Sequence, residues 1–461
     1  IKLAGNLTAN GGSATTTRGN SGVITFTGGA IELDADVTIQ TKLAAVGSGG
    51  TANAVTFTGA ASTIDSDAIA RALTVDTGTG AVVFGGSIGQ SASGAQGLKS
   101  LTVTTTGATT LGGDIRTADD PSTTGVTISG PVTLTGNRTI LTDRTTTDGF
   151  ISLGSTVNAD AAVNRRTLTL TAGSQNVTVS GATGGTQSLG GFTATGNVIS
   201  VGAVTTTGSA SDGGAVSITG TGAVTAGLIT ASGGTATAAG FNGGNVSVAG
   251  ATVTSAGVTT AGTNAVSGVG GAGGTVLLDA TGGAPTVTLS GNISAIGGNG
   301  SAGNVGGAGG GVSFADPVSL GANVVVSSNG GTGTTAGTGG NIQFSSSIDA
   351  DAAGNSRTLQ LVGGTGNVTL SGAVGGTQAL QTLTVTSGNA VSLPTITTRN
   401  GGVAVTGSAI TLNGNVNTTS LATAGAVTFT GPVTLANNVV VNTDAATTDA
   451  GVTFSNTVNA E

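Results

Sequence analysis

The sequence predicts an all-β protein: a parallel β-helix (β-solenoid), which we expect to be right-handed with 25–30 residues per coil. Three observations lead to this fold class. The composition is rich in glycine and in β-branched residues, short runs alternate between apolar and polar residues, and the chain repeats itself on two length scales.

The composition favours short strands over disorder. Glycine supplies 87 of 461 residues and charged residues only 7%, whereas average proteins carry about 7% glycine and about 25% charged residues. Disorder requires low hydrophobicity, but 37% of this chain is hydrophobic. Valine, isoleucine and threonine fit a pleated surface. We therefore expect strands joined by Gly, Asn and Asp turns.

The strands are marked by period-2 alternation, as in the segments 55–57 (VTF), 168–170 (LTL) and 177–179 (VTV). Such alternation places one face inward and one outward. A unit of two or three short strands cannot bury a face alone, whereas coaxial stacking buries a continuous core and pairs the backbone groups of successive coils. At this coil length the chain gives about 15–18 coils, with ~4.8 Å between strands.

A long repeat organises the chain. Residues 125–160 align with residues 426–461 without a gap, a third copy begins at Gly311, and a weaker copy begins at Val23. The last copy stops where the others continue, so we expect the native polypeptide to continue beyond Glu461. The absence of an initiator Met before Ile1 indicates a processed chain or a fragment.

A short repeat sets the coil. Ends of the VTF-type strands recur at steps of 25 to 31 residues, and in the glycine-rich middle the steps are 30, 30 and 36. We predict solenoid modules over 1–195, a Gly-rich insertion of 30-residue solenoid units over 196–310, and modules over 311–461, the last one truncated. The competing architecture, a string of immunoglobulin-like sandwiches, needs about 100 residues per domain. The module steps of 102, 186 and 115 are too uneven for it.

The phrases TVNADAAVNRRTLTLTAGSQNVTVSGATGGTQSL and PVTLANNVVVNT resemble those of giant bacterial exoproteins, the filamentous-haemagglutinin-like and autotransporter-associated β-strand-repeat proteins. The resemblance covers nearly the whole chain and lies in composition and repeat style. It implies export, a place on or outside the cell surface, and a role as adhesin, fibre or matrix component. The secretion domain and membrane anchor expected of such proteins are not in this segment.

Candidate catalytic groups are few, because the chain has no Cys, Trp, Tyr or His. Nucleophilic systems based on His or Cys are excluded, and only paired carboxylates remain. The pairs Asp65/Asp67 and Asp349/Asp351 share the module position of Asp160, and an arginine follows in each copy: Arg71, Arg357 and Arg165. Two further acidic pairs are Asp34/Asp36 and Asp119/Asp120.

The repeated acidic position has two interpretations: a calcium or acid/base site, or a corner turn in which Asp caps the backbone and pairs with Arg. A catalytic site should be singular, so repetition favours the corner, and we predict no catalytic residue and no enzyme. Asp65, Asp67, Asp349 and Asp351 remain weak calcium candidates, although the chain has neither the calcium-binding nonapeptide nor an EF-hand loop. No other cofactor is predicted.

The glycine-rich stretches at 262–274, 297–311 and 330–340 lack the Lys-Ser/Thr ending of a phosphate-binding loop. We expect them to be long loops that leave the coil or close-packed backbone turns. Asn-x-Ser/Thr sequons are interpreted as ladder and turn residues; they begin at Asn6, Asn137, Asn176, Asn245, Asn292, Asn367 and Asn417.

Charge and hydropathy exclude some partners. The net charge is −8 and no basic cluster is visible, which argues against nucleic acid. There is no apolar run of 18 residues that would span a membrane.

The sequence thus predicts a non-enzymatic structural repeat segment of a secreted or cell-surface fibre, sheath or adhesin. The expected partners are other copies of the chain, its own continuation, or contacts with a cell surface or matrix.

Two alternatives remain open. The first is a glycan- or cell-surface-binding module, for which the insertion 196–310 would project loops. The second is a carbohydrate-active β-helix enzyme.

Overall fold

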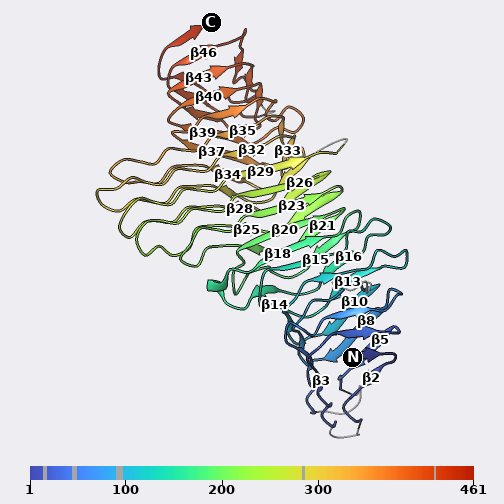
Figure 1. Ribbon diagram of the computed structural model, residues 1–461. Helices are drawn as coiled ribbons and strands as arrows, with labels where there is room; N and C mark the ends of the chain where they lie inside the picture. Colours follow the sequence, from blue (N-terminus) through green and yellow to red (C-terminus); the bar gives the residue numbers. More distant parts are fainter. Residues whose placement is uncertain (14–17, 44–48, 90–96, 283–285, 420–421) are drawn as a thin grey trace. The chain divides into compact units, whose positions relative to one another are not determined.

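The computed structural model describes residues 1–13, 18–43, 49–89, 97–282, 286–419 and 422–461. The protein is all-β, with about 1% helix, and its parallel sheets are stacked as a β-solenoid of about 17 turns (Figure 1). The predicted fold class is confirmed. The chain divides into two compact units, residues 1–205 with 218–222, and residues 206–217 with 223–461.

The first unit has three sheet faces, each built from strands that are usually three positions apart along the chain. Its first face contains β1 (Lys2–Leu3), β4 (Ile31–Leu33), β7 (Ile64–Ser66), β12 (Ile115–Arg116), β15 (Arg138–Leu141), β18 (Thr167–Thr171) and β20 (Gly191–Gly196). Its second face contains β2 (Leu7–Thr8), β5 (Val37–Gln40), β8 (Ala72–Gly78), β10 (Ser100–Thr105), β13 (Gly125–Ile128), β16 (Phe150–Leu153), β19 (Val177–Val179) and β21 (Ile199–Val201). Its third face contains β3 (Ile24–Thr27), β6 (Val55–Thr58), β9 (Val82–Phe84), β11 (Thr109–Leu111), β14 (Val132–Leu134), β17 (Val157–Ala159) and β22 (Val204–Thr205). A 3-10 helix, η1, covers Ala162–Asn164.

The second unit repeats the three-faced plan. One face contains β26 (Val246–Gly250), β29 (Val276–Ala280), β32 (Val312–Phe314), β35 (Ile342–Phe344), β38 (Val368–Leu370), β40 (Ala390–Leu393), β43 (Ala409–Leu412), β46 (Val433–Leu435) and β49 (Val458–Ala460). The next contains β24 (Ala223–Ala226), β27 (Thr252–Ser255), β30 (Val287–Leu289), β33 (Val318–Leu320), β36 (Ile348–Ala350), β41 (Ile396–Thr397), β44 (Val416–Asn417) and β47 (Val441–Asn442). The last contains β25 (Ile229–Thr230), β28 (Val258–Thr259), β31 (Ile293–Ser294), β34 (Val324–Ser327), β37 (Thr358–Gly364), β39 (Thr382–Ser387), β42 (Val403–Thr406), β45 (Val427–Thr430) and β48 (Val452–Phe454). The remaining strand, β23 (Val216–Gly220), carries residues of both units.

Each coil contributes one strand to each face, so a strand usually pairs in parallel with the strand three positions later, as β13 does with β16. Among the described residues, a single residue replaces a strand at three places and forms isolated bridges to the coils before and after it: Ile88, Thr183 and Val374. These single-residue rungs keep the three-faced order where a coil is short.

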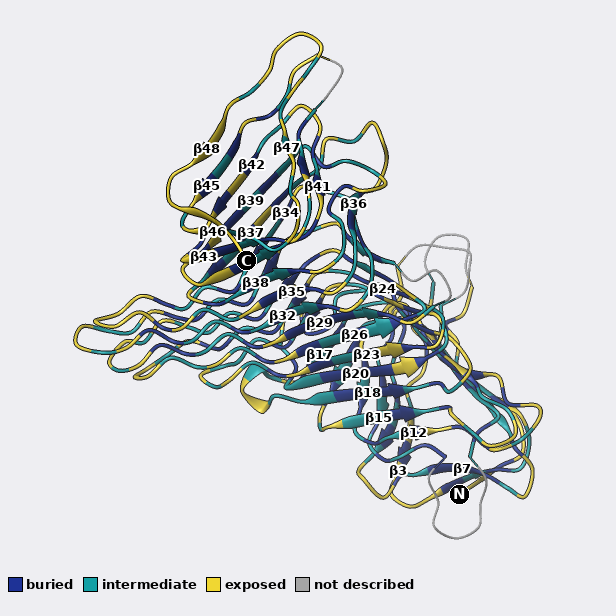
Figure 2. Cartoon of the chain, turned by 90° about the horizontal axis from the view of Figure 1, so that it is seen from above, coloured by how far each residue is buried: buried dark blue, intermediate teal, exposed yellow. Residues whose placement is uncertain are grey.

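The core consists of the inward residues of the alternating runs. Val55 and Phe57 are buried and Thr56 is only half-buried, and Leu168 and Leu170 follow the same rule. Parallel pairing without a shift stacks like on like: the ring of Phe57 lies 4.7 Å from that of Phe26, and the ring of Phe344 lies 4.3 Å from that of Phe314. The predicted inward and outward faces are confirmed (Figure 2).

The long sequence repeat does not coincide with a fixed face. In the first unit, successive copies begin at β3 on the third face and at β13 on the second. In the second unit they begin at β32 and β45, again on different faces. The first interval is eleven strand positions with Ile88 counted, and the second is fourteen with Val374 counted. The two differ by three positions, which is one whole coil, so the longer repeat gains length without changing the order of the faces.

The glycine-rich loops of the second unit form one stacked body, here named the glycine fin: residues 206–215, 231–245, 260–275, 295–311 and 328–341. Figures 1 and 2 show these loops stacked side by side and reaching away from the coils. Backbone hydrogen bonds join successive loops, with Gly243 N donating to Ala272 O at 2.8 Å and Gly273 N donating to Ala308 O at 2.8 Å. The stretches therefore both leave the coil and pack closely.

Inside the fin, backbone packs directly on backbone. A Cβ on Gly262 would overlap the carbonyl oxygen of Gly271 in the returning arm, and a Cβ on Gly307 would overlap the same oxygen from the next loop. A zigzag of hydrogen bonds runs through this interior: Gly307 N donates to Gly298 O at 2.7 Å, and Gly298 N donates to Gly271 O at 2.7 Å. Only glycine fits there, because any side chain would force the arms apart.

Candidate functional site

The predicted acidic position forms a corner that is built three times, here named the Asp–Arg corner. Its three pairs are Asp67–Arg71, Asp160–Arg166 and Asp351–Arg357. Each arginine holds its carboxylate through two parallel hydrogen bonds, from Nε and Nη2, at 2.7–3.0 Å. This two-point geometry is the strongest form of the Arg–carboxylate contact. It ties the two ends of the corner loop together.

The arginine contact governs the acidity of these carboxylates. The hydrogen bonds from Arg71 are the main cause that lowers the pKa of Asp67 to about 2, with a backbone hydrogen bond from Ile69 assisting. Arg166 and Arg357 lower the pKa of Asp160 and Asp351 in the same way. All three carboxylates are thus held in the charged form at neutral pH.

One residue assignment from the sequence was wrong. Arg165 does not pair with Asp160; the partner is Arg166. Arg165 ends η1 with a left-handed backbone (φ 46°), and the following residue returns to the carboxylate as the chain enters β18. Two adjacent arginines could not be separated by spacing alone, because the deciding feature is the 3-10 turn.

The other carboxylate of the corner caps backbone amides. On β36, Asp349 Oδ1 accepts hydrogen bonds from Thr377 N at 2.8 Å and Gln378 N at 2.9 Å. At the equivalent place on β17, Asn158 Oδ1 accepts two amides of the next coil at 2.9 and 3.1 Å. A neutral amide oxygen does the same work, so this position does not depend on a charge.

The four calcium candidates lie at these corners. Asp67 and Asp351 are bound by arginine, Asp349 caps amides, and Asp65 is buried on β7. In the part of the chain that the structure describes, no three residues of the types Asp, Glu, His and Cys group together as metal ligands. Calcium binding at Asp65, Asp67, Asp349 and Asp351 stays a prediction.

The sequon asparagines confirm their interpretation as ladder and turn residues. Six of the seven accept a backbone N–H from the next coil at 2.8–3.3 Å; the pairs are Asn6 with Thr38, Asn137 with Thr167, Asn176 with Val198, Asn245 with Thr275, Asn292 with Val325, and Asn367 with Ala390. The seventh, Asn417, caps Thr419 N in its own turn at 3.0 Å. In each of the acidic pairs Asp34/Asp36 and Asp119/Asp120, one carboxylate also accepts a backbone N–H. Asp36 accepts a hydrogen bond from Ala72 N at 2.9 Å, and Asp119 accepts one from Thr146 N at 2.6 Å.

Sequence reasoning missed a buried hydroxyl that closes the base of many loops. Thr260 Oγ1 donates to Gly274 O at 2.7 Å, across a fin loop, and Ser328 Oγ donates to Gly340 O at 2.6 Å in another. Thr418 closes a much shorter loop in the same way, with Gly425 O at 2.6 Å. The sequence does carry a sign of this hydroxyl: a Thr or Ser that directly follows the last, outward-facing residue of a strand.

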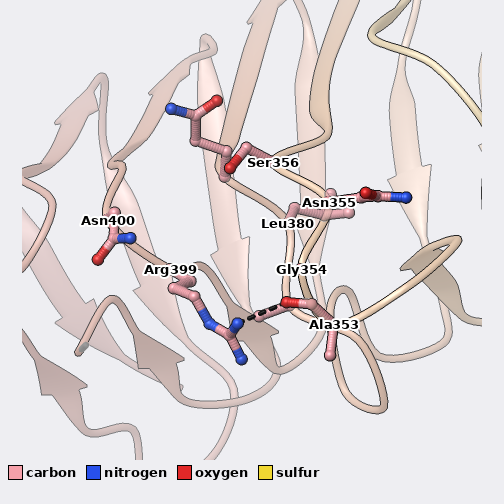
Figure 3. A pocket seen from close by; sticks show the side chains of 9 residues that line it. Ala353, Gly354, Asn355, Ser356, Leu380, Arg399 and Asn400 are labelled. Atoms are coloured by element: carbon pink, nitrogen blue, oxygen red, sulfur yellow. Dashed lines mark hydrogen bonds between the residues drawn. The ribbon is translucent and has the colours of Figure 1, made fainter. Parts of the chain in front are cut away.

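One pocket of the second unit lies beside the third Asp–Arg corner (Figure 3). It is formed by three loops from successive coils: 353–356, 379–381 and 399–400. The side chain of Arg399 reaches across two coils, and its Nη1 donates to Ala353 O at 2.5 Å. Sequence reasoning did not find this pocket, because its residues are brought together only by the stacking of coils.

A second hollow, in the first unit, is lined by Arg116, Asp119, Asp143, Arg144 and Thr145. Burial and the nearby Arg116 lower the pKa of Arg144. The opposite charges in this hollow are balanced, and Asp119 is engaged with a backbone amide. It offers no net charge to a ligand.

Comparison of the chain with protein-family models, with curated proteins and with solved structures found no match. Among the described residues, no helix is long and apolar enough to cross a membrane.

Proposed function

We propose that this chain is a non-enzymatic structural repeat segment of a secreted or cell-surface fibre, sheath or adhesin. The observation that carries the proposal is the use of polar side chains. The acidic and amide groups that sequence reasoning singled out cap backbone N–H groups of the next coil or close a corner loop. Catalysis concentrates such groups at one place, whereas here the same arrangement recurs from coil to coil.

The arrangement suits mechanical work. Backbone hydrogen bonds run from coil to coil, and the Asn and Asp side chains add a second set at the turns. Inside, Val, Leu, Ile and Phe fill a narrow core to below a few per cent exposure. Burial of each such side chain contributes roughly 1.5–3 kcal/mol. Coils joined in this way resist bending within each unit, because every coil is hydrogen-bonded to the next.

The place of action follows from the resemblance to giant bacterial exoproteins. We expect a bacterial protein on the cell surface or outside the cell. Its partners would be its own continuation or other copies of the chain, together with cell-surface or matrix contacts.

Electron microscopy of the native material, with immunogold labelling against this segment, tests the proposal. Label along continuous fibres with an axial spacing near ~4.8 Å would support a fibre or sheath. Label on isolated short rods at the cell surface would support an adhesin stalk. Label confined to the cell interior, or cleavage of a polysaccharide by the purified chain, would contradict the proposal, and cleavage would favour the alternative of a carbohydrate-active β-helix enzyme.

A further inference from the structure

We propose that the pocket formed by loops 353–356, 379–381 and 399–400 binds a small saccharide that carries a carboxylate, a uronic acid unit of an acidic glycan. The inference goes beyond the structural role and does not depend on it. Binding of this kind would give one point of the solenoid a chemical specificity that the repeated corners lack.

The pocket is held in shape by its surroundings. Asn355 Nδ2 donates to Asp351 Oδ1 at 2.8 Å, so the first loop is tied to the Asp351–Arg357 pair. Gln381 N donates to Arg357 O at 2.7 Å and attaches the second loop to the same corner. Leu380, which is fully buried, anchors that loop in the core. A ligand would therefore meet a preformed site and would not have to order it.

Charge favours an anion. Arg399 is exposed at the pocket, and its described hydrogen bond to Ala353 O uses one of the five N–H groups of the guanidinium. No carboxylate side chain is among the lining residues that the structure describes. In the adjoining corner, Asp351 has both oxygens engaged by Arg357. A planar guanidinium with remaining donors matches a carboxylate group in two-point geometry.

The rest of the lining favours hydroxyl groups. Figure 3 shows Ser356 and Asn400 near Arg399, and Gln381 also belongs to the lining. These side chains supply both donors and acceptors, as a sugar ring requires. Aromatic rings are absent from the described lining, so recognition would rest on hydrogen bonds and charge.

The pocket is individual, although its frame is repeated. In the Asp160–Arg166 corner of the first unit, Val163 stands in place of Gly354, Arg165 in place of Ser356, and Gly190 in place of Gln381. Val163 is 73% exposed and projects where the other copy has no side chain. The repeated corner explains how the loops fold, but it does not explain these three residue differences. Gly354, Ser356 and Gln381 open the site and line it with small or polar groups, which their counterparts in the Asp160–Arg166 corner do not do.

Titration of the full chain with trigalacturonate, followed by calorimetry or by NMR, tests the inference. Saturable binding that weakens with added salt is expected, while neutral galactotriose should bind at least about tenfold more weakly, because it cannot pair with the guanidinium. R399Q should reduce trigalacturonate binding at least about tenfold, and R399K should lose part of it. R116Q, in the other unit, removes the same charge and should leave binding unchanged.

A second variant, G354V, copies the uncharged side chain of Val163 into the pocket and should block binding without changing any charge. Unfolding profiles of R399Q and G354V should match the wild type, because both positions are exposed and a side chain at position 354 meets no neighbouring atom. No binding of trigalacturonate by the wild type, equal binding of galactotriose, or undiminished binding by R399Q would each overturn the proposal. Equal affinity for acetate would reduce the site to a simple anion site and would also overturn it.

Discussion

The body of the second unit and its glycine fin exclude water by opposite means. In the body, Val, Leu, Ile and Phe point inward from three faces, and Phe314 and Phe344 stack in the core. In the fin, the two arms of each loop meet with no side chain between them, as Gly262 meets Gly271. The first region is stabilised by apolar burial, and the second by hydrogen bonds between closely packed peptide groups.

The difference teaches what each region tolerates. A hydrophobic core accepts changes of shape among residues of similar volume. A backbone interior accepts no side chain at all, because the smallest one already overlaps a carbonyl oxygen. The glycine content of 87 residues is thus in part a packing requirement.

The largest effect is expected from a cavity in the body. Phe344→Ala removes a fully buried ring from its stack on Phe314 and should destabilise the neighbouring coils by about 3–5 kcal/mol. Hydrogen exchange of the β32, β35 and β38 amides measures the loss locally, since a repeat array has no single unfolding transition. Gln343→Ala, at the outward neighbour, is the control; equal effects of the two changes would show that the ring is not part of a tight core.

A smaller and more local effect is expected from overpacking the fin. Gly307→Ala places a methyl group against Gly271 O and should cost roughly 1–3 kcal/mol. Exchange protection should fall in the fin loops 260–275 and 295–311 and remain in the strands of the body. Gly311→Ala is the matched control, because its nearest neighbour to a new Cβ is Asn341 O at 3.8 Å. Equal protection of the fin in both variants would refute direct backbone packing.

The hydroxyl at the base of the fin gives a third comparison. Thr260→Val removes a buried hydrogen bond to Gly274 O at nearly constant volume and should cost about 1 kcal/mol. Ala231 and Ala295 occupy the same place in the two adjacent loops, so the fin tolerates the loss of this bond. Thr259→Val, at the outward neighbour on β28, should have less effect in urea unfolding; the reverse order would exclude the closing role of the hydroxyl.

Local sequence patterns predict which side chains of a strand point inward. They do not predict on which face of the solenoid each repeat copy begins, because that depends on the number of strand positions between copies. The alternation at 55–57 and 168–170 predicted which side chains point inward, because that rule needs only the period of a strand. The sequence did not reveal that repeat copies begin on different faces. That result depends on Ile88 and Val374, single residues that occupy a strand position without any strand pattern around them.

The Asp–Arg corner and the pocket also differ in how far the sequence predicts them. The pairing of Asp67 with Arg71 and of Asp351 with Arg357 could be predicted, since the partners lie four and six residues apart. The choice of Arg166 over Arg165 could not, because the conformation of one turn decides it. The pocket at Arg399 could not be predicted from the sequence, because its residues come from three coils and only the register of the stacked coils brings them together.

The smallest effect is expected from the Asp–Arg corners, which lie at the surface. The folded-state pKa of Asp67 is about 2, below the ordinary value of 3.8, so the folded state binds fewer protons between these two values. The stabilisation is therefore fully present above about pH 4 and is lost as the pH falls through about 2. Asp67→Asn should lower stability at pH 6 and have a much smaller effect at pH 2, where the carboxylate is already partly protonated, as measured by urea unfolding at each pH. Asp349→Asn is the matched change in a corner, and it should have little effect at pH 6 because Asn158 already serves that role in another copy. If Asp67→Asn shifted stability equally at both pH values, the charge would not be the source of the contribution, and the corner would act through its hydrogen bonds alone.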